Sequence, residues 1–308
     1  MQALIRYSLR RIGQLIPVLF GVSLISFSLL HLIPGDPAMI IGGIDAKPET
    51  LAAIRAEFGL DDPLPVQYAQ YVSRAVRGDL GVAIRTRDPV IDTLWTRLQF
   101  TVQLTAIATA ISALVGILLG ILAAVHQNSW LDTGLTLVAL AGVSVPGFWL
   151  GLILMQLFAA QLGWLPAGGS GTPQHLILPA IVLGVSGAAY KTRLTRSSML
   201  EVIRQDFIRT LRANGVSDRL IIYKHALRNA LNPVITVIGL QFGALLAGSV
   251  LVETVFALPG IGRLMVNSIF TRDYPMIQGG ILLIAVTFLL VNLVVDLTYA
   301  LVNPRIRY

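Results

Sequence analysis

FTVQLTAIATAISALVGILLGILAAV, residues 100–125, carries no charged side chain and is apolar along most of its length. Because a helix needs about 20 mostly apolar residues to cross a bilayer, this stretch is long enough to span a membrane. Similar runs occur elsewhere in the chain, and together they predict six membrane-spanning helices. The predicted spans are Ile12–Ile33, Phe100–Val125, Thr133–Ala160, Leu176–Tyr190, Val234–Phe256 and Gly279–Val302.

The composition of the whole chain indicates the same class of protein. Its 308 residues are 55% hydrophobic and 13% charged, whereas soluble domains average about 25% charged residues. Cysteine is absent, which excludes disulfides, thiolate metal sites and thiol catalysis. The first apolar run is longer than the core of a secretory signal and lacks a small-residue cleavage pattern. We therefore predict an all-α membrane protein that keeps its first helix.

Positive charge is concentrated between the fourth and fifth predicted spans. The chain has a formal net charge of +7 and 23 Lys and Arg residues. The basic residues in this segment are Lys191, Arg193, Arg196, Arg204, Arg209, Arg212, Arg219, Lys224 and Arg228. Since Lys and Arg are enriched in cytoplasmic loops of membrane proteins, we place the segment in the cytoplasm. The charge is not interleaved with aromatic residues in a soluble domain, which argues against nucleic-acid binding.

The charges beside the other spans set the orientation. Both ends of the chain are basic, whereas residues 161–175 contain neither Lys nor Arg. Six spans place both termini and the basic segment on the same side, which the charge rule makes cytoplasmic. Residues 34–99 then lie outside. Within them, Pro48–Gly59 and Gln67–Val76 predict two short helices of a folded external cap.

The basic segment has the sequence of two helices separated by Gly215. Glycine often follows the last residue of a helix, because it takes a positive φ at little cost. The first helix is predicted over Met199–Asn214, with an apolar face of Leu200, Ile203, Phe207 and Leu211. The second is expected to start at a Ser217 cap and to have an apolar face of Val216, Leu220, Tyr223 and Leu227. Pro233 is expected to end the segment before the fifth span.

The residues of this segment leave two interpretations open. A basic amphipathic segment can lie on anionic lipid, or it can form a folded surface that binds a protein partner. The length of the segment and its helix boundaries favour the second interpretation.

The sequence lacks the motifs of common catalytic sites. No glycine is followed by lysine, so a P-loop for ATP is excluded, and neither H-E-x-x-H nor G-x-S-x-G occurs. GGSG at 168–171 is expected to be a flexible external turn, and the four histidines lack ligand spacing. We therefore predict no catalytic residue, no cofactor and no metal site in this chain. Energy for any active process must come from a partner.

Few ionisable residues fall inside the predicted spans. Glu253 lies near the outer end of the fifth, and Asp296 lies near the inner end of the sixth, one turn from Asn292. A polar contact that fixes helix packing is the favoured interpretation, and a polar lining of a substrate path is the alternative. Small residues allow close helix approach in the third and fifth spans, and Pro146 is expected to kink the third. The candidate pathway or gate residues are Ser144, Pro146, Gly243, Ser249 and Glu253.

Motifs spread over nearly the whole chain carry a family resemblance. DFIRTLRANG (206–215) and KHALRNALNP (224–233) resemble the cytoplasmic loop of permease subunits of ATP-binding-cassette (ABC) importers. More narrowly, they resemble the dipeptide, oligopeptide, nickel and glutathione permease family. Other similar segments are HLIPGDP (31–37), GDLG (78–81), TRSSMLEV (195–202), ETVFALPGIGRL (253–264), RDYP (272–275) and NPRIR (303–307). Leu211 and Asn214 depart from the small residue and the lysine that the family commonly has there.

The resemblance implies a type-1 ABC importer transmembrane domain. It has an external cap between helices 1 and 2 and a cytoplasmic coupling loop between helices 4 and 5. The implied divisions are a basic segment with the first helix (1–33), an external region (34–99), a transmembrane core (100–303) with its coupling loop (191–233), and a cytoplasmic tail (304–308).

In such importers the loop docks into a groove of the ATPase subunit, and the resemblance carries this role to residues 209–232. The implied coupling residues are Asp206, Arg209, Arg212, Gly215, Arg219, Tyr223, Lys224, Arg228 and Asn229. The implied partners are a homologous permease, two ABC ATPase subunits, an extracytoplasmic solute-binding protein, membrane lipid and a small-peptide substrate. The implied function is import of dipeptides, oligopeptides or glutathione across a bacterial inner membrane. An importer of nickel chelates, an ion-coupled transporter and a membrane enzyme are the alternatives.

Overall fold

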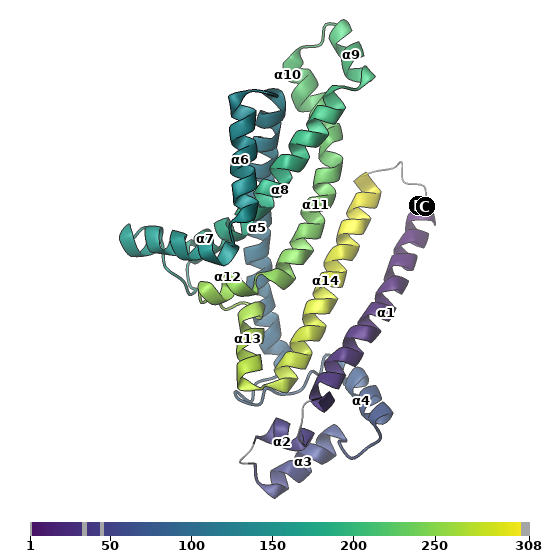
Figure 1. The fold of residues 1–308 in the computed structure, drawn as a ribbon. Helices are drawn as coiled ribbons and strands as arrows, with labels where there is room; N and C mark the ends of the chain where they lie inside the picture. Colours follow the sequence, from purple (N-terminus) through teal and green to yellow (C-terminus); the bar gives the residue numbers. More distant parts are fainter. Residues whose placement is uncertain (1, 33–35, 44–45, 303–308) are drawn as a thin grey trace. The chain divides into compact units, whose positions relative to one another are not determined.

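The computed structural model describes residues 2–32, 36–43 and 46–302, and within these ranges it is helical without a strand (Figure 1). The predicted tail (304–308) and the NPRIR segment (303–307) lie outside the described residues. The helices up to residue 161 are α1 (Gln2–Leu32), α2 (Pro37–Gly42), α3 (Pro48–Phe58), α4 (Leu64–Val76), α5 (Val90–Val125), α6 (Trp130–Ser144), α7 (Gly147–Leu154) and the π-helix η1 (Met155–Gln161). The later ones are the 3₁₀ turn η2 (Pro173–Leu176), α8 (Ile177–Ile203), α9 (Asp206–Ala213), α10 (Asp218–Leu220), the π-helix η3 (Ile221–Ala226), α11 (Leu227–Gly248), α12 (Val250–Val255), α13 (Ile261–Thr271) and α14 (Tyr274–Val302).

Five helices in the described part of the chain are long and apolar enough to cross a membrane. A sixth span requires α6 and the α7–η1 helix to be counted together, although they meet at an angle of 100°. The third predicted span is therefore not one helix. Val145 precedes Pro146 and is extended, with ψ at 123°, because proline disfavours the helical conformation of the residue before it. The sequence predicted a kink at Pro146, and the structure has a full break there.

The fifth predicted span is wrong at both ends. Pro233 does not end the basic segment, since it lies inside α11. Membrane helices tolerate proline because neighbouring groups can satisfy the freed backbone positions. At the other end, the helix stops at Gly248, and α12 follows as a separate short helix after Ser249.

The chain folds into two compact units, each built from separated stretches of sequence. Among the described residues, one consists mainly of residues 2–101 and Pro259–Leu293, and the other mainly of Val102–Leu258 and residues 294–302.

In the first unit, the predicted external helices are present. α3 begins at Pro48 and is followed by Gly59 in the left-handed conformation, with φ at +61°. α4 starts at Leu64, three residues before the predicted start at Gln67. Its Tyr68 hydroxyl lies 2.7 Å from the Ser23 hydroxyl of α1.

In the second unit, α8 is the central helix and packs against α6, α7 and α11. α5 approaches it closely, because a Cβ at Gly116 would lie 2.6 Å from the Lys191 Cβ and one at Gly120 would lie 2.5 Å from the Thr195 Cβ. Two glycines four residues apart allow this kind of close helix contact inside a membrane. The two glycines let the face of α8 that carries Lys191 and Thr195 pack directly against α5.

The GGSG turn in the same unit is packed rather than free. The Gly169 amide donates to the Phe256 carbonyl at 2.8 Å, and a Cβ at Gly168 would clash with that carbonyl. The expectation of a flexible turn is therefore wrong. Gly168 is needed for close approach to the end of α12, whereas Gly169 has a positive φ of 93°, which favours glycine.

Candidate functional site

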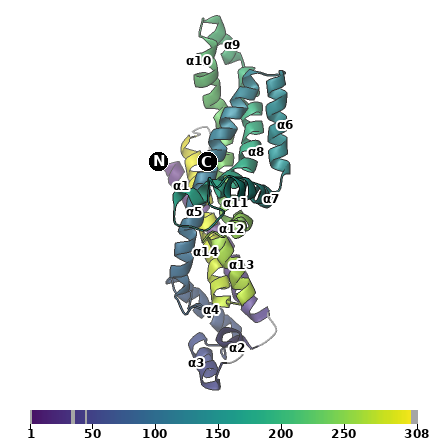
Figure 2. The ribbon, with the colours of Figure 1, turned by 90° about the vertical axis from the view of Figure 1, so that its left-hand side faces the viewer.

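The candidate site is the basic loop between α8 and α11, which we define as residues 204–226. Figures 1 and 2 show α9 and α10 beyond the adjoining ends of α8 and α11. The first predicted loop helix is divided, because Met199–Ile203 belongs to α8 and α9 starts only at Asp206. Gln205 interrupts the helix with an extended backbone, ψ being 152°.

Gly215 lies between α9 and α10, as predicted, with φ at +78°. Its amide donates to the Arg212 carbonyl at 3.0 Å, and the Val216 amide donates to the Leu211 carbonyl at 3.1 Å. These bonds satisfy carbonyls at the end of α9, which is the usual function of a glycine at this position. A Cβ at Gly215 would meet no atom within 4 Å, so the requirement for glycine is a backbone requirement.

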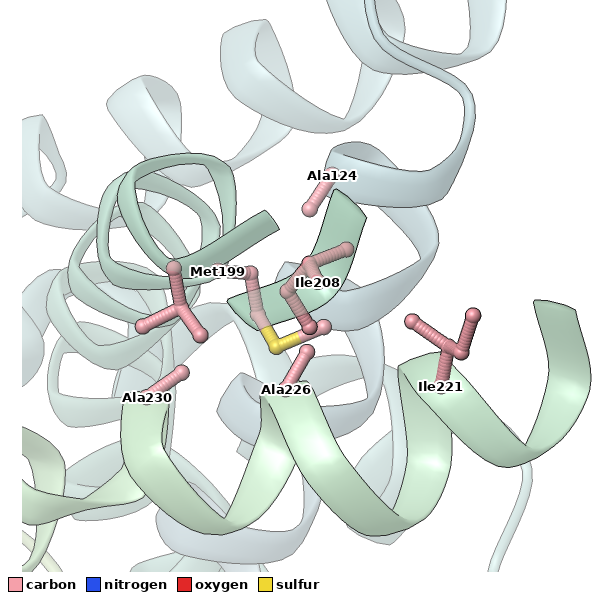
Figure 3. Packing of buried hydrophobic residues seen from close by; sticks show 7 residues of the cluster. Ala124, Met199, Ile208, Ile221, Ala226 and Ala230 are labelled. Atoms are coloured by element: carbon pink, nitrogen blue, oxygen red, sulfur yellow. The ribbon is translucent and has the colours of Figure 1, made fainter. Parts of the chain in front are cut away.

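The loop has its own apolar core, in which side chains from α5, α8, α9, η3 and α11 converge (Figure 3). We call this the loop core. Its buried members are Ala124, Met199, Val202, Ile208, Ile221, Ala226 and Ala230, and Leu200, Ile203, Leu211, Val216, Ile222 and Leu227 pack around them. The loop is therefore a folded surface supported by the ends of the helices beneath it.

Three residues of the predicted apolar faces point elsewhere. Phe207, Leu220 and Tyr223 are 37%, 44% and 57% exposed, whereas Ile208 and Ile221 are fully buried. The break at residues 204–205 shifts the helical phase of α9 relative to α8. The wider π-turn of η3 shifts the phase of the second helix in the same way.

The charged side of the loop is exposed. Asp206 and Arg209 form an ion pair at 3.5 Å, and Arg212 and Asp218 form a second pair across Gly215 at 3.1 Å. Exposed pairs of this kind contribute about 0–1 kcal/mol to stability, so most of the charge is available for contacts with a partner. The remaining predicted coupling residues are also exposed, and they are Arg219, Tyr223, Lys224, Arg228 and Asn229.

The first cations of the basic segment belong to the helix bundle and not to the loop. Arg196 of α8 binds Asp132 of α6 through two bonds, Nε to Oδ1 at 2.6 Å and a terminal nitrogen to Oδ2 at 2.7 Å. Asp132 is only 4% exposed and also accepts from the Asn128 amide at 3.0 Å. Lys191 is completely buried. Neither the Arg196–Asp132 contact nor the burial of Lys191 was predicted. Positive charge alone does not distinguish a cation of a loop from one that binds inside the bundle.

The structure brings together two of the five candidate pathway or gate residues. Ser249 and Glu253 are fully buried, and the serine hydroxyl donates to Glu253 Oε1 at 2.8 Å. Gly243 is buried in α11, whereas Ser144 and Pro146 are exposed and the Ser144 hydroxyl donates to its own helix. The Ser249–Glu253 contact stabilises the break between α11 and α12, which fits the favoured packing interpretation of Glu253.

The described residues contain no cluster of three or more His, Asp or Glu side chains that could hold a metal ion. The arrangement offers a folded charged surface on a helix bundle.

Solved structures identify the class of this fold. A chain of the inward-facing MetNI methionine ABC transporter is similar over 68% of this chain and 96% of its own length, with a TM-score of 0.58 and 18% identity. A chain of an amino acid ABC transporter is similar over 70% and 94%, with a TM-score of 0.53 and 17% identity. At these identities the likeness concerns the fold, which is that of the membrane component of a type-1 ABC importer.

Sequence comparison gives the family. Residues 116–308 match the model of the binding-protein-dependent transport system inner membrane component, and residues 4–105 match the model of the N-terminal part of such membrane components. The chain belongs to this family of ABC importer permeases. It is 46% identical to the glutathione transport system permease protein GsiC of Escherichia coli K12 over 305 residues, which are 99% of this chain and all of GsiC. It is 45% identical to the dipeptide transport system permease protein DppB of Alkalihalophilus pseudofirmus, covering 99% of this chain and all of DppB.

The family implies that the chain is a multi-pass inner-membrane permease that works with ATPase and other permease subunits.

Proposed function

We propose that this permease imports small peptides, including dipeptides and glutathione, and that it takes its energy through the loop at residues 204–226. The cargo class rests on the full-length similarity to a glutathione permease and a dipeptide permease. The coupling role rests on one structural observation: the loop is folded on its own apolar core and leaves its charged side exposed.

We infer the partners from the family together with this arrangement. The chain pairs with a homologous permease, and two ABC ATPase subunits bind the charged side of the loops. The cytoplasmic side is the side of the loop and of both termini, as the distribution of Lys and Arg indicates. A solute-binding protein then docks on the external side, to which the charge distribution assigns residues 34–99. The chain itself does not hydrolyse ATP, since the sequence has no P-loop.

Transport proceeds by alternating access. ATP binding brings the ATPase subunits together and moves the two loops, so that the permease opens outward and receives peptide from the binding protein. Hydrolysis returns the permease to its inward-open state. The ATPases must bind one state of the permease more tightly than the other, because a partner that binds both equally shifts no population.

Charge reversal on the loop tests the coupling role. Arg209→Glu with Arg212→Glu, in a permease pair reconstituted with its ATPases, is expected to reduce recovery of the ATPases in pull-down. It should reduce peptide-dependent ATP hydrolysis in parallel. Arg77→Glu is the matched control, since Arg77 is an exposed arginine of the external region. Equal ATPase recovery from the loop variant and the control would overturn the proposed coupling surface.

Uptake of labelled glutathione and of a labelled dipeptide into proteoliposomes tests the cargo. We expect ATP-dependent uptake of at least one of them when the solute-binding protein is present. Uptake of neither, in a preparation with active ATPases, would overturn the peptide assignment.

A further inference from the structure

Lys191 places a positive charge inside the helix bundle of the second unit. Its side chain is fully buried, and its ammonium donates to the Ser112 hydroxyl of α5 at 2.9 Å. It also donates to the Gln241 side-chain carbonyl of α11 in a short contact. A single side chain of α8 therefore joins three helices.

The ammonium lies beside the middle of a predicted membrane span. Ser112 is close to the middle of the apolar run at residues 100–125, far from either end of it. The backbone around the contact is adapted to it, because a Cβ at Gly187 of α8 would clash with the Gln241 amide. Glycine at 116 likewise leaves room for the Lys191 side chain against α5.

Stability does not account for a lysine at this position. Both side chains that accept from the ammonium are neutral, so no opposite charge among these contacts offsets its removal from water. Apolar side chains of similar volume commonly replace buried charged groups without loss of stability, or with a gain. A methionine would fill much of the same space. Unlike a methionine, the ammonium makes directional hydrogen bonds to α5 and α11. These bonds fix the positions of the two helices along α8.

We propose that Lys191 is a positioning residue of the transport cycle, which ties α5 and α11 to α8 so that the three helices move as one body. The loop at residues 204–226 is the connection between α8 and α11, so a force on it acts first on the ends of these two helices. The tie prevents them from sliding past each other. The Arg196–Asp132 contact joins α6 to the same helix. This role rests on the proposed function of the loop.

The test uses Lys191→Met in the complete importer, with Gln241→Leu as a second variant that removes an acceptor and leaves the lysine in place. Both are expected to insert in the membrane and to recover the ATPases. Both are expected to transport about tenfold less peptide per ATP hydrolysed, which corresponds to roughly 1.4 kcal/mol of lost coupling. The double variant should be no worse than either single variant, because both changes remove the same contact.

A distance measurement separates a positioning role from a merely structural one. The chain has no cysteine, so spin labels can be placed at Arg193→Cys on α8 and Ala244→Cys on α11, which are both exposed. With Lys191 present, the distance distribution should be the same without nucleotide and with trapped ATP. With Lys191→Met, it should differ between the two states.

Three results would overturn the proposal. These are an unchanged ratio of peptide to ATP in Lys191→Met, an unchanged distance distribution in that variant, and a loss of assembly that accounts for all of the lost transport. Failure of the proposed function would be distinct, because the unmodified complex would then show no peptide-dependent hydrolysis at all.

Discussion

Replacement of Gly215 by valine places a strained residue in the middle of the proposed ATPase-binding loop. The observed φ of +78° lies in the left-handed region, where an ordinary L-residue costs about 1–2 kcal/mol and a β-branched residue is a stronger outlier. No atom would lie within 4 Å of the new Cβ, so the whole cost is in the backbone. The loop must either accept this cost or leave the conformation that closes the end of α9.

A cost of about 1–2 kcal/mol changes a two-state population by a factor of about 5–30. If the ATPase binds only the observed conformation, its apparent Kd rises by up to that factor, because affinity falls with the population of the competent state. Gly215→Asn is the matched control, since asparagine tolerates the left-handed region better than other side chains. We add Gly215→Ala as an intermediate variant. The affinity of the ATPase for the permease is therefore expected to be highest with glycine at position 215 and to fall in the order asparagine, alanine, valine.

The assay is titration of purified ATPase subunit onto the permease pair in lipid nanodiscs, with thermal unfolding measured on the same samples. We expect insertion and unfolding temperature to change little in all three variants. Binding of the ATPase to Gly215→Val as tightly as to the unmodified chain would refute the proposed role of the Gly215 conformation. Equal losses in the asparagine and valine variants would refute the backbone explanation.

Three further predictions concern stability. Ile208→Ala removes a fully buried member of the loop core and should lower the free energy of unfolding by about 2–5 kcal/mol. The neighbouring Phe207→Ala should cost clearly less because Phe207 is 37% exposed, and equal losses in thermal unfolding would contradict the position of the loop core. Gly168→Ala should destabilise the permease, because its Cβ would clash with the Phe256 carbonyl. The control Gly134→Ala in α6 has no atom within 4 Å of the new Cβ and should stabilise the permease by up to about 1 kcal/mol. Similar unfolding temperatures for the two variants would argue against the packed turn. The Ala38 amide and the Arg55 guanidinium hold the pKa of Asp36 below its ordinary value of 3.8; because the folded pKa is lowered, this contribution to stability is present above that value and is lost as the pH falls through the lowered pKa. The protection of α2 amides against hydrogen exchange, corrected for the intrinsic exchange rate at each pH, should therefore fall below about pH 4 in the unmodified chain. Asp36→Asn should show no such step, and an identical acid step in both would rule out this carboxylate as the cause.

The membrane helices could be predicted from apolar runs, because hydrocarbon requires long helices with satisfied backbones. The position of Gly215 between two loop helices was also predictable, since few other residues adopt a positive φ cheaply. Both predictions depend on local chemistry that the sequence displays directly.

The departures from prediction have a common physical origin in contacts between distant residues. Lys191 has the sequence context of a loop cation, but its partners are Ser112 and Gln241 on other helices. The apolar faces of the loop were assigned by helical spacing, which fails where a break at residues 204–205 or the π-turn of η3 changes the phase. No periodic pattern in the sequence indicates the break or the π-turn.

The angle of the break at Pro146 could not be predicted from the sequence either. Proline disfavours the helical conformation of the residue before it, but it does not set the angle between the two helices. The angle of 100° between α6 and α7–η1 results from how each of them packs. α7 contacts both α8 and α12, and these contacts involve residues far away in the sequence.

The most direct test of the loop as the entry point of energy is photo-crosslinking in the assembled importer. A photoreactive amino acid at Tyr223, whose side chain is exposed on the loop, is compared with the same amino acid at Arg77 in the external region. We predict that the ATPase subunit crosslinks from position 223 and not from position 77. The yield from position 223 is expected to change when ATP is trapped. Absence of an ATPase crosslink from position 223, or an equal yield from both positions, would contradict the coupling role.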